Sequence, residues 1–319
     1  STLAHQLKCG FRDVVLLAPE GITPGPELSD RVHVVTHDVF AEDALVGAVN
    51  QMIDRVAGAW LHYCHNTEYL FFPFCETRRV GEMLTFHAEE RREAMLTYVI
   101  DLYAGDLGAH GNAVDLQDCW LDRSGYYALA RKDPARHNHP KERQLDFYGG
   151  LRWRFEEHVP PARRRIDRIS LFRARPGLRL LPDFTLSEEE MNTYACAWHH
   201  NLTAAVCSFR TAKALRSNPG SRHAIPGFRW HNSAPFRWES QQFMALGLME
   251  PGQWFGPLAG GRRRPEARRG TGRLSLRASD AGGGYPRSLP ARLRPCAGGS
   301  PHRRGRRPSP RAPSARRRC

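Results

Sequence analysis

The side chains best suited to chemistry are four polar residues at positions 65–68, which separate two apolar runs. They are His65, Asn66, Thr67 and Glu68. Polar groups between two buried strand segments cost free energy unless they pair with one another or bind a ligand. Ligand binding is therefore one interpretation of the cluster. An ordinary strand-to-strand turn, in which Asn and Thr are common, is the other.

A second candidate is the segment 147–155 (FYGGLRWRF), which we predict to be a strand broken by two glycines. Gly149 and Gly150 would let another backbone or a ligand come close. On a strand, Arg152 and Arg154 would point to the same face and could clamp a phosphate or a carboxylate. A pair of surface residues engaged in ion pairs is the alternative.

Histidines and cysteines elsewhere give weaker signals. His137 and His139, in the sequence HNHP, could hold a metal ion, but no third ligand is in view and exposed loop histidines are the favoured interpretation. His199 and His200 lie on a predicted strand within 193–210, where adjacent side chains point to opposite faces, so at most one would face a site. The eight cysteines show no C-x-x-C spacing, so we expect reduced thiols in a cytosolic protein.

Alternating apolar segments predict the elements that must position these residues. Helices are expected at 3–9, 41–56, 79–90 and 236–249, and strands, the first of them buried, at 13–18, 32–36, 60–63, 94–103 and 166–173. Alternation of strands and helices predicts βαβ units and a parallel sheet. Ligands of such sheets bind beyond the carboxyl ends of the strands, where 65–68 would lie. The polar segment 105–146 is expected to be an irregular insertion.

The distribution of charge divides the chain at residue 255. Residues 256–319 carry 18 Arg, no Lys and two acidic residues, a net charge of +16, whereas residues 1–255 carry 29 basic and 31 acidic residues, a net charge of −2. The tail is rich in Arg, Gly, Pro, Ala and Ser, so we predict it to be disordered. A frame-shifted or read-through end of a GC-rich gene is one explanation of this composition, and a basic arm for RNA, DNA or anionic lipid is the alternative. Because the body is nearly neutral, nucleic acid is not the expected partner.

Membrane insertion is not expected from the sequence. No apolar run approaches the roughly 20 residues that span a bilayer, and residues 1–11 lack the apolar segment of a signal peptide. We expect a cytoplasmic protein, and we leave open a peripheral association with the inner face of the membrane. The printed sequence does not begin with Met, so this expectation covers only the segment shown.

Several segments together resemble a known family. The chain is similar to bacterial family-2-like glycosyltransferases of the GT-A fold, which open with an E-W-L-x-H-H helix and carry a D-x-D-E-[FL]-L motif at a strand end. The matching positions, spread over most of residues 2–255, are Leu3, Ala4, His5, Gly10, Phe11, Val14, Trp60, Glu68, Tyr69, Leu70, Phe72, Pro73, Cys75, Glu76, Thr77, Arg78, Gly149, Gly150, Arg152, Arg154 and Phe155.

The resemblance implies a fold and an activity. The fold is a single α/β domain at 1–255, GT-A-like and Rossmann-like, with a mostly parallel mixed sheet. The activity is transfer of a sugar from a nucleotide-sugar donor to a hydroxyl of a glycan or lipid-linked acceptor, in the synthesis of surface polysaccharide or glycan. In the family a divalent cation, Mg²⁺ or Mn²⁺, bridges the diphosphate, and a carboxylate acts as the base.

The resemblance also assigns roles to residues. Donor binding is expected at Asn66, Glu68, Arg152 and Arg154, and metal binding at His65 and Glu68. For the base we expect Glu156 or Glu157, with Asp115 and Asp118 as rivals.

The chain departs from the family at three places. His65 and Thr67 stand where the two metal-binding aspartates belong, so we expect weak or lost binding of Mn²⁺ or Mg²⁺. Residues 19–21 (PEG) replace the Asn and Ser or Asp residues that hold the nucleotide, and the strand expected before the opening helix is missing, through truncation or divergence. Three hypotheses result: a glycosyltransferase with an impaired metal motif, a catalytically inactive binding module of the same fold, and a nucleic-acid-binding protein that uses its basic tail.

Overall fold

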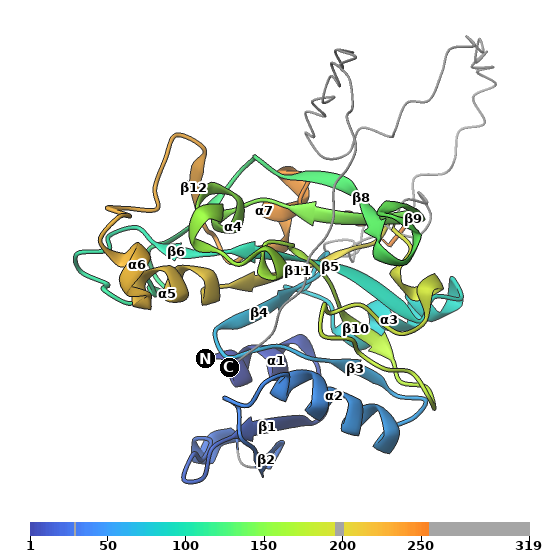
Figure 1. Ribbon diagram of the computed structural model, residues 1–319. Coiled ribbons are helices and arrows are strands. Elements are labelled where there is room, and N and C mark those ends of the chain that lie inside the picture. Colours follow the sequence, from blue (N-terminus) through green and yellow to red (C-terminus); the bar gives the residue numbers. More distant parts are fainter. Residues whose placement is uncertain (29, 195–200, 255–319) are drawn as a thin grey trace, which may run out of the picture.

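A curled five-stranded sheet forms the centre of the computed structural model, which describes residues 1–28, 30–194 and 201–254 (Figure 1). The protein is therefore a mixed α/β protein. The order of strands across the sheet is β3-β10-β5-β11-β4. Their bounds are Trp60–His62 for β3, Asp167–Arg173 for β10, Ala94–Asp101 for β5, Ala204–Ser208 for β11 and Glu68–Phe71 for β4.

The expectation of a mostly parallel sheet is wrong. Of the four pairings described within the central sheet, that of β11 with β5 is parallel and the other three are antiparallel. The reason is that β10 enters between β3 and β5, while β4 follows β3 after a short turn and runs back. Because β10 is antiparallel to both of its neighbours, β3, β5 and β11 still run in one direction. Their carboxyl ends therefore meet at one edge of the sheet.

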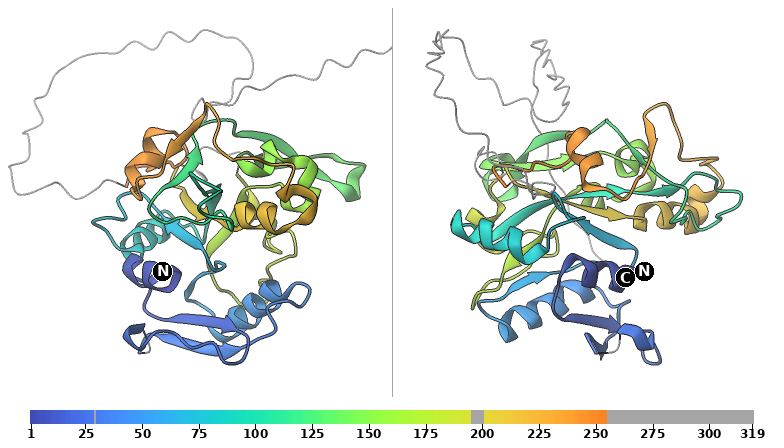
Figure 2. Two further views of the ribbon diagram at one scale, coloured as in Figure 1. Left: turned by 90° about the vertical axis from the view of Figure 1, so that its left-hand side faces the viewer. Right: turned by 180° about the vertical axis from the view of Figure 1, so that it is seen from behind.

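A second, two-stranded parallel sheet consists of β1 (Val14–Ala18) and β2 (Val32–Thr36). Figures 1 and 2 show α1 (Thr2–Cys9) and α2 (Ala44–Arg55) between this small sheet and the central one. The strands lie where the sequence predicts them, but the expectation that β1 is fully buried is wrong, since only Ala18 of this strand is buried.

The segment 105–146 is not an irregular insertion. It contains β7 (Cys119–Asp122), β8 (Tyr127–Asp133) and most of β9 (His139–Tyr148). Strands β8 and β9 form an antiparallel hairpin, and β7 pairs with β6 (Tyr103–Ala104) and β12 (Ser233–Pro235). The charged side chains of the hairpin hide its strand pattern, and the distant partner of β7 cannot be read from local sequence.

The expected strand at 147–155 is also only partly correct. Strand β9 ends at Tyr148, and a short helix α4 (Leu151–Arg154) follows. Gly150 turns the chain with φ 64° and ψ −153°, a conformation almost restricted to glycine. Arg152 and Arg154 therefore lie on a helix, about 200° apart around its axis, and do not share a strand face.

Four further α-helices lie in the described part of the chain. They are α3 (Val80–Glu89), which confirms the helix predicted at 79–90, α5 (Arg210–Ser217), α6 (Pro219–Arg222) and α7 (Ser240–Ala245). The helix predicted at 236–249 is thus confirmed only in its centre. The described residues contain no helix long and apolar enough to cross a membrane.

Two apolar clusters pack on the faces of the central sheet. Leu70 and Phe72 of the β4 segment join Val99 and Val206 against residues of α1 and α3. Tyr69 and Phe71 point to the other cluster, which includes residues of α2. This alternation follows from the two-residue period of a strand. Glu68 and Leu70 are two residues apart on β4, so Glu68 lies on the same face as Leu70, the face that packs against α1.

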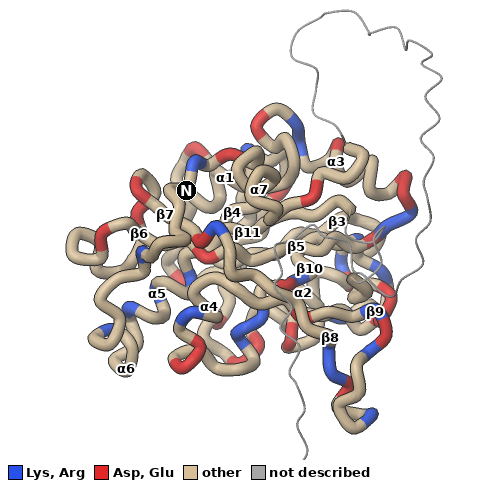
Figure 3. Tube along the Cα trace, turned by 90° about the horizontal axis from the view of Figure 1, so that it is seen from above, with Lys and Arg blue, Asp and Glu red and all other residues tan. Residues whose placement is uncertain are grey.

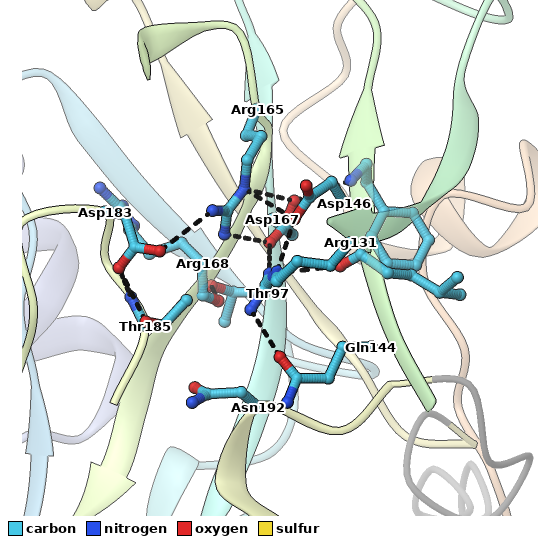
Figure 4. A network of polar contacts seen from close by, with 12 residues as sticks. Thr97, Arg131, Gln144, Asp146, Arg165, Asp167, Arg168, Asp183, Thr185 and Asn192 are labelled. Carbon is cyan, nitrogen blue, oxygen red and sulfur yellow. Dashed lines mark hydrogen bonds and ion pairs between the residues drawn. The ribbon is translucent and has the colours of Figure 1, made fainter. Parts of the chain in front are cut away.

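A buried ion network fastens the β8–β9 hairpin to the central sheet (Figure 4). The carboxylate of Asp167 on β10 accepts hydrogen bonds from Arg131 Nη2 at 3.1 Å, Arg165 Nη2 at 2.7 Å and the backbone N–H of Phe147 at 2.7 Å. The backbone carbonyl of Arg165 in turn accepts a bond from Arg152 Nη1 at 2.8 Å. The network therefore helps to fix α4 at the edge of the sheet.

Charges of both signs are interspersed along the described trace (Figure 3). The Arg-rich tail at 256–319, for which we predict disorder, lies outside the described residues. The same holds for His199 and His200.

Candidate functional site

Residues 65–68 form a turn at the sheet edge where β3, β5 and β11 end. The backbone N–H of Glu68 donates to the carbonyl of His65 at 3.2 Å, and Thr67 has a φ of 63°. The N–H of Phe209, just after β11, donates to the carbonyl of Thr67 at 3.2 Å. The turn interpretation is therefore confirmed. It does not exclude ligand binding, because the turn lies against the end of β11.

Three polar residues form a row across this edge. Glu68 on β4 pairs in register with Ser208 on β11, and Ser208 pairs with Asp101 on β5. Residues directly opposite on neighbouring strands project to the same face. The Ser208 hydroxyl accordingly donates to Glu68 Oε1 at 3.2 Å. Two buried carboxylates thus lie on one face, separated by about 10 Å of sheet width.

Glu68 is completely buried and fully engaged. Its Oε2 accepts hydrogen bonds from Arg168 Nη2 at 2.9 Å and from the backbone N–H of His65 at 2.8 Å. Burial would raise the pKa of Glu68, but the positive charge of Arg168 and the contact with His65 outweigh it and hold the pKa well below its usual range. The carboxylate is therefore ionised, and its charge is neutralised by Arg168.

The imidazole of His65 lies between a carboxylate and a guanidinium. Its Nδ1 is 3.4 Å from Glu68 Oε2 and 3.0 Å from Arg210 Nη1. Burial lowers the pKa of His65, so the ring is neutral at pH 7. Since a guanidinium can only donate, Nδ1 is the acceptor in the contact with Arg210.

Asp101 is the second buried carboxylate of the row. The backbone N–H and the Nε of Arg152 each lie 3.4 Å from it, and Arg152 Nε also donates to Thr211 Oγ1 at 3.1 Å. Burial raises the pKa of Asp101, with Arg152 opposing the rise. Gly150 allows this approach, because a Cβ at that position would lie 3.0 Å from Asp101 Oδ2.

Arg154 is bound to a different carboxylate. Its Nη1 lies 3.1 Å from Asp122 Oδ1, and its guanidinium stacks 4.6 Å from the ring of Trp230. The phenol of Tyr103 donates to the same Asp122 oxygen at 2.6 Å. The predicted same-face clamp of Arg152 and Arg154 is therefore wrong, because each arginine neutralises its own buried aspartate.

His65 and Glu68 do not fit an Mg²⁺ or Mn²⁺ ion. Such ions take about six oxygen ligands in an open coordination sphere. The Glu68 oxygens face Arg168, Ser208 and His65, and the His65 Nδ1 faces the guanidinium of Arg210, which would repel a cation. Within residues 1–28, 30–194 and 201–254, no group of three His, Cys, Asp or Glu side chains could hold a metal ion. His137 and His139 therefore belong to no such group among these residues.

Other predicted site residues have structural partners. The side-chain oxygen of Asn66 accepts bonds from Thr2 Oγ1 and the N–H of Thr67, which fixes the turn against α1. Glu156 and Glu157 are exposed on a short 3₁₀ helix, where they contact Arg164 and His158.

The rival carboxylates, Asp115 and Asp118, are engaged elsewhere. Asp115 lies 3.1 Å from His110 Nε2, and Asp118 accepts from Trp120 Nε1 at 2.8 Å. Among the described residues, the polar contacts of Glu156, Glu157, Asp115 and Asp118 all lie outside the 65–68 turn.

Four residues of the edge were missed by reasoning from sequence: Asp101, Arg168, Ser208 and Arg210. Asp101 and Arg168 did carry a signal, since each is a charged residue within a predicted buried strand and must be paired. Ser208 and Arg210 carry none, because only the pairing of β11 with β4 and β5 brings them to the turn.

Comparisons with protein families, with characterised proteins and with solved structures find no match. Function must therefore be argued from the geometry of this edge and from the motif resemblance.

Proposed function

We propose that this protein is a glycosyltransferase-like protein that binds a nucleotide-sugar donor at the edge where β3, β5 and β11 end. The observation that carries the proposal is the row Glu68, Ser208 and Asp101, placed beside the 65–68 turn. Ligands of α/β sheets bind at such an edge. The motif resemblance at 60–78 supports the same position from the sequence.

In this proposal the residues have separate roles. Glu68, which is paired with Arg168, stabilises the turn. It does not act as a base, because its pKa lies well below its usual range. Asp101 is better suited to accept a proton from an acceptor hydroxyl, since burial raises its pKa. It replaces Glu156 and Glu157 as our candidate base. Arg152 keeps Asp101 oriented toward the edge.

A binding module without catalysis is the second candidate. It is favoured by one observation: His65 and Glu68, the remnants of the metal motif, are bonded to arginines. Both candidates predict binding of the donor, but only the first predicts turnover.

The two candidates can be separated by one pair of assays on the full chain. Equilibrium binding of UDP- and GDP-sugars is measured first, with EDTA and then with Mn²⁺. Release of UDP or GDP from any bound donor is then followed in the presence of simple acceptors. Turnover that Asp101→Asn abolishes while donor binding persists supports the enzyme. Binding without turnover in the unmodified protein supports the module.

A further inference from the structure

The guanidinium of Arg210 lies at the beginning of α5, directly beside the 65–68 turn. Arg210 is exposed, and its one hydrogen-bonded side-chain partner in the described parts of the chain is the neutral imidazole of His65, at 3.0 Å. No carboxylate of the described residues lies within ion-pair distance of it. The other N–H groups of this guanidinium are therefore available to an acceptor.

The surroundings of Arg210 carry an excess of positive charge. Partial desolvation of its guanidinium lowers the pKa of Arg210, and the charges of Arg168, Arg152 and Arg163 lower it further, while the charge of Glu68 acts in the opposite direction. Glu68 is already neutralised by Arg168, and Asp101 by Arg152. Among the described residues, no carboxylate forms an ion pair with Arg210 or Arg163, and the guanidinium of Arg163 packs on the ring of Phe184 at 5.6 Å from its centroid.

The backbone of α5 adds to this excess. Arg210 is the first residue of the eight-residue helix, and the first turn contains no acidic residue. The unpaired N–H groups of a helix start carry a partial positive charge, so they favour an anion. The side chain of Arg210 and the start of its helix thus both lie next to the turn, since Arg210 contacts His65 and the N–H of Phe209 donates to the carbonyl of Thr67.

We propose that Arg210, supported by Arg163 and the first turn of α5, binds the diphosphate of the donor directly and without a metal ion. This inference rests on the proposed nucleotide-sugar function and deepens it. A guanidinium presents several N–H donors in a plane and pairs with two phosphate oxygens at once. The guanidinium of Arg210 lies beside His65, the residue that stands where the family has an aspartate. The positive charge of the arginine side chain thereby takes the place of the bound metal ion.

The test measures binding of inorganic pyrophosphate, UDP and UDP- or GDP-sugars to the full chain by calorimetry, in EDTA. We expect binding that Mn²⁺ does not strengthen and that weakens with rising salt. Arg210→Gln should weaken pyrophosphate binding by about tenfold to a hundredfold, the effect of losing one charge-assisted contact. Arg210→Lys should retain part of the affinity. Arg55→Gln, which removes an exposed arginine at the end of α2, is the matched control and should bind as the unmodified protein does.

Folding of the variant is checked by its thermal midpoint. Because Arg210→Gln removes a charge from a positively charged neighbourhood, its midpoint should equal or exceed that of the unmodified protein. Affinity for pyrophosphate that is unchanged in Arg210→Gln, or that requires Mn²⁺, would overturn the inference.

The failure of this inference can be told apart from failure of the proposed function. If pyrophosphate binds through Arg210 but no nucleotide sugar binds, the anion site stands and the glycosyltransferase proposal falls. If a nucleotide sugar binds only with Mn²⁺ and equally well in Arg210→Gln, the function stands and the metal-free site falls.

Discussion

The carboxylate of Glu68 lies 2.9 Å from the guanidinium of Arg168, and both side chains are almost completely buried, with exposed fractions of 1% and 5%. This pair joins the start of β4, beside the 65–68 turn, to β10, although β5 and β11 lie between these two strands in the sheet. Because neither charge can reach water, each depends on the other. The pair therefore fixes the turn that the proposed donor site is built on.

Removing one partner of this pair should strongly destabilise the fold. Glu68→Gln leaves Arg168 as a buried charge without a counter-charge, and we expect a loss of about 3–5 kcal/mol in the free energy of unfolding. Urea denaturation measures the loss. Glu82→Gln is the matched control, since its pair with Arg78 is half exposed and should contribute less than about 1 kcal/mol. Equal effects of the two substitutions would contradict the assigned role.

The conformation of Gly150 should be sensitive to a single methyl group. In Gly150→Ala the new Cβ would lie 3.0 Å from Asp101 Oδ2, on a backbone with φ 64° and ψ −153°. We expect a loss of about 1–3 kcal/mol in the free energy of unfolding and weaker donor binding, because Asp101 and Arg152 must shift.

The control for this substitution is Gly47→Ala in α2, where a Cβ meets nothing within 4 Å. It should leave binding unchanged and raise stability by roughly 0.5–1 kcal/mol. A Gly150→Ala protein as stable as the Gly47→Ala protein would show that the turn tolerates a side chain.

Acid should destabilise the protein through His87. This side chain is 1% exposed, its Nε2 lies 2.9 Å from the carbonyl of Ala94, and burial lowers its pKa from 6.5 to about 4. Between these values the unfolded chain binds more protons than the folded one, so stability is complete above pH 6.5 and falls as the pH drops toward 4.

Between pH 7 and pH 5 the loss from this one group should be about 2 kcal/mol, because at pH 5 the unfolded histidine is largely protonated and the folded one is not. Urea denaturation at pH 7 and at pH 5 tests it, with His87→Gln as the variant. A shallower dependence on pH in the variant is the expected result. The same dependence in both proteins would assign the acid sensitivity to other groups.

The sequence predicted the local elements better than their arrangement. The helices α1, α2 and α3 and the strands β1, β2, β3, β5 and β10 lie close to their expected positions, because their apolar periodicity is strong. Sheet order was not predictable, since the insertion of β10 between β3 and β5 is a long-range pairing with no local signature.

The same distinction holds for the candidate site. The turn at 65–68 stood out because its polar residues interrupt apolar runs. The helical position of Arg152 could not be foreseen, because a single glycine conformation at Gly150 converts an expected strand into a turn and a helix. Arg210 reaches His65 only through the packing of β11 against β4, which no pattern in its own segment reveals.

The most direct test of the central claim is equilibrium binding of UDP- and GDP-sugars to the full chain, measured by calorimetry with and without Mn²⁺. The account predicts saturable binding of at least one donor in EDTA, with an affinity that falls in Arg210→Gln and not in Arg55→Gln. Absence of binding to every donor under both conditions would contradict it.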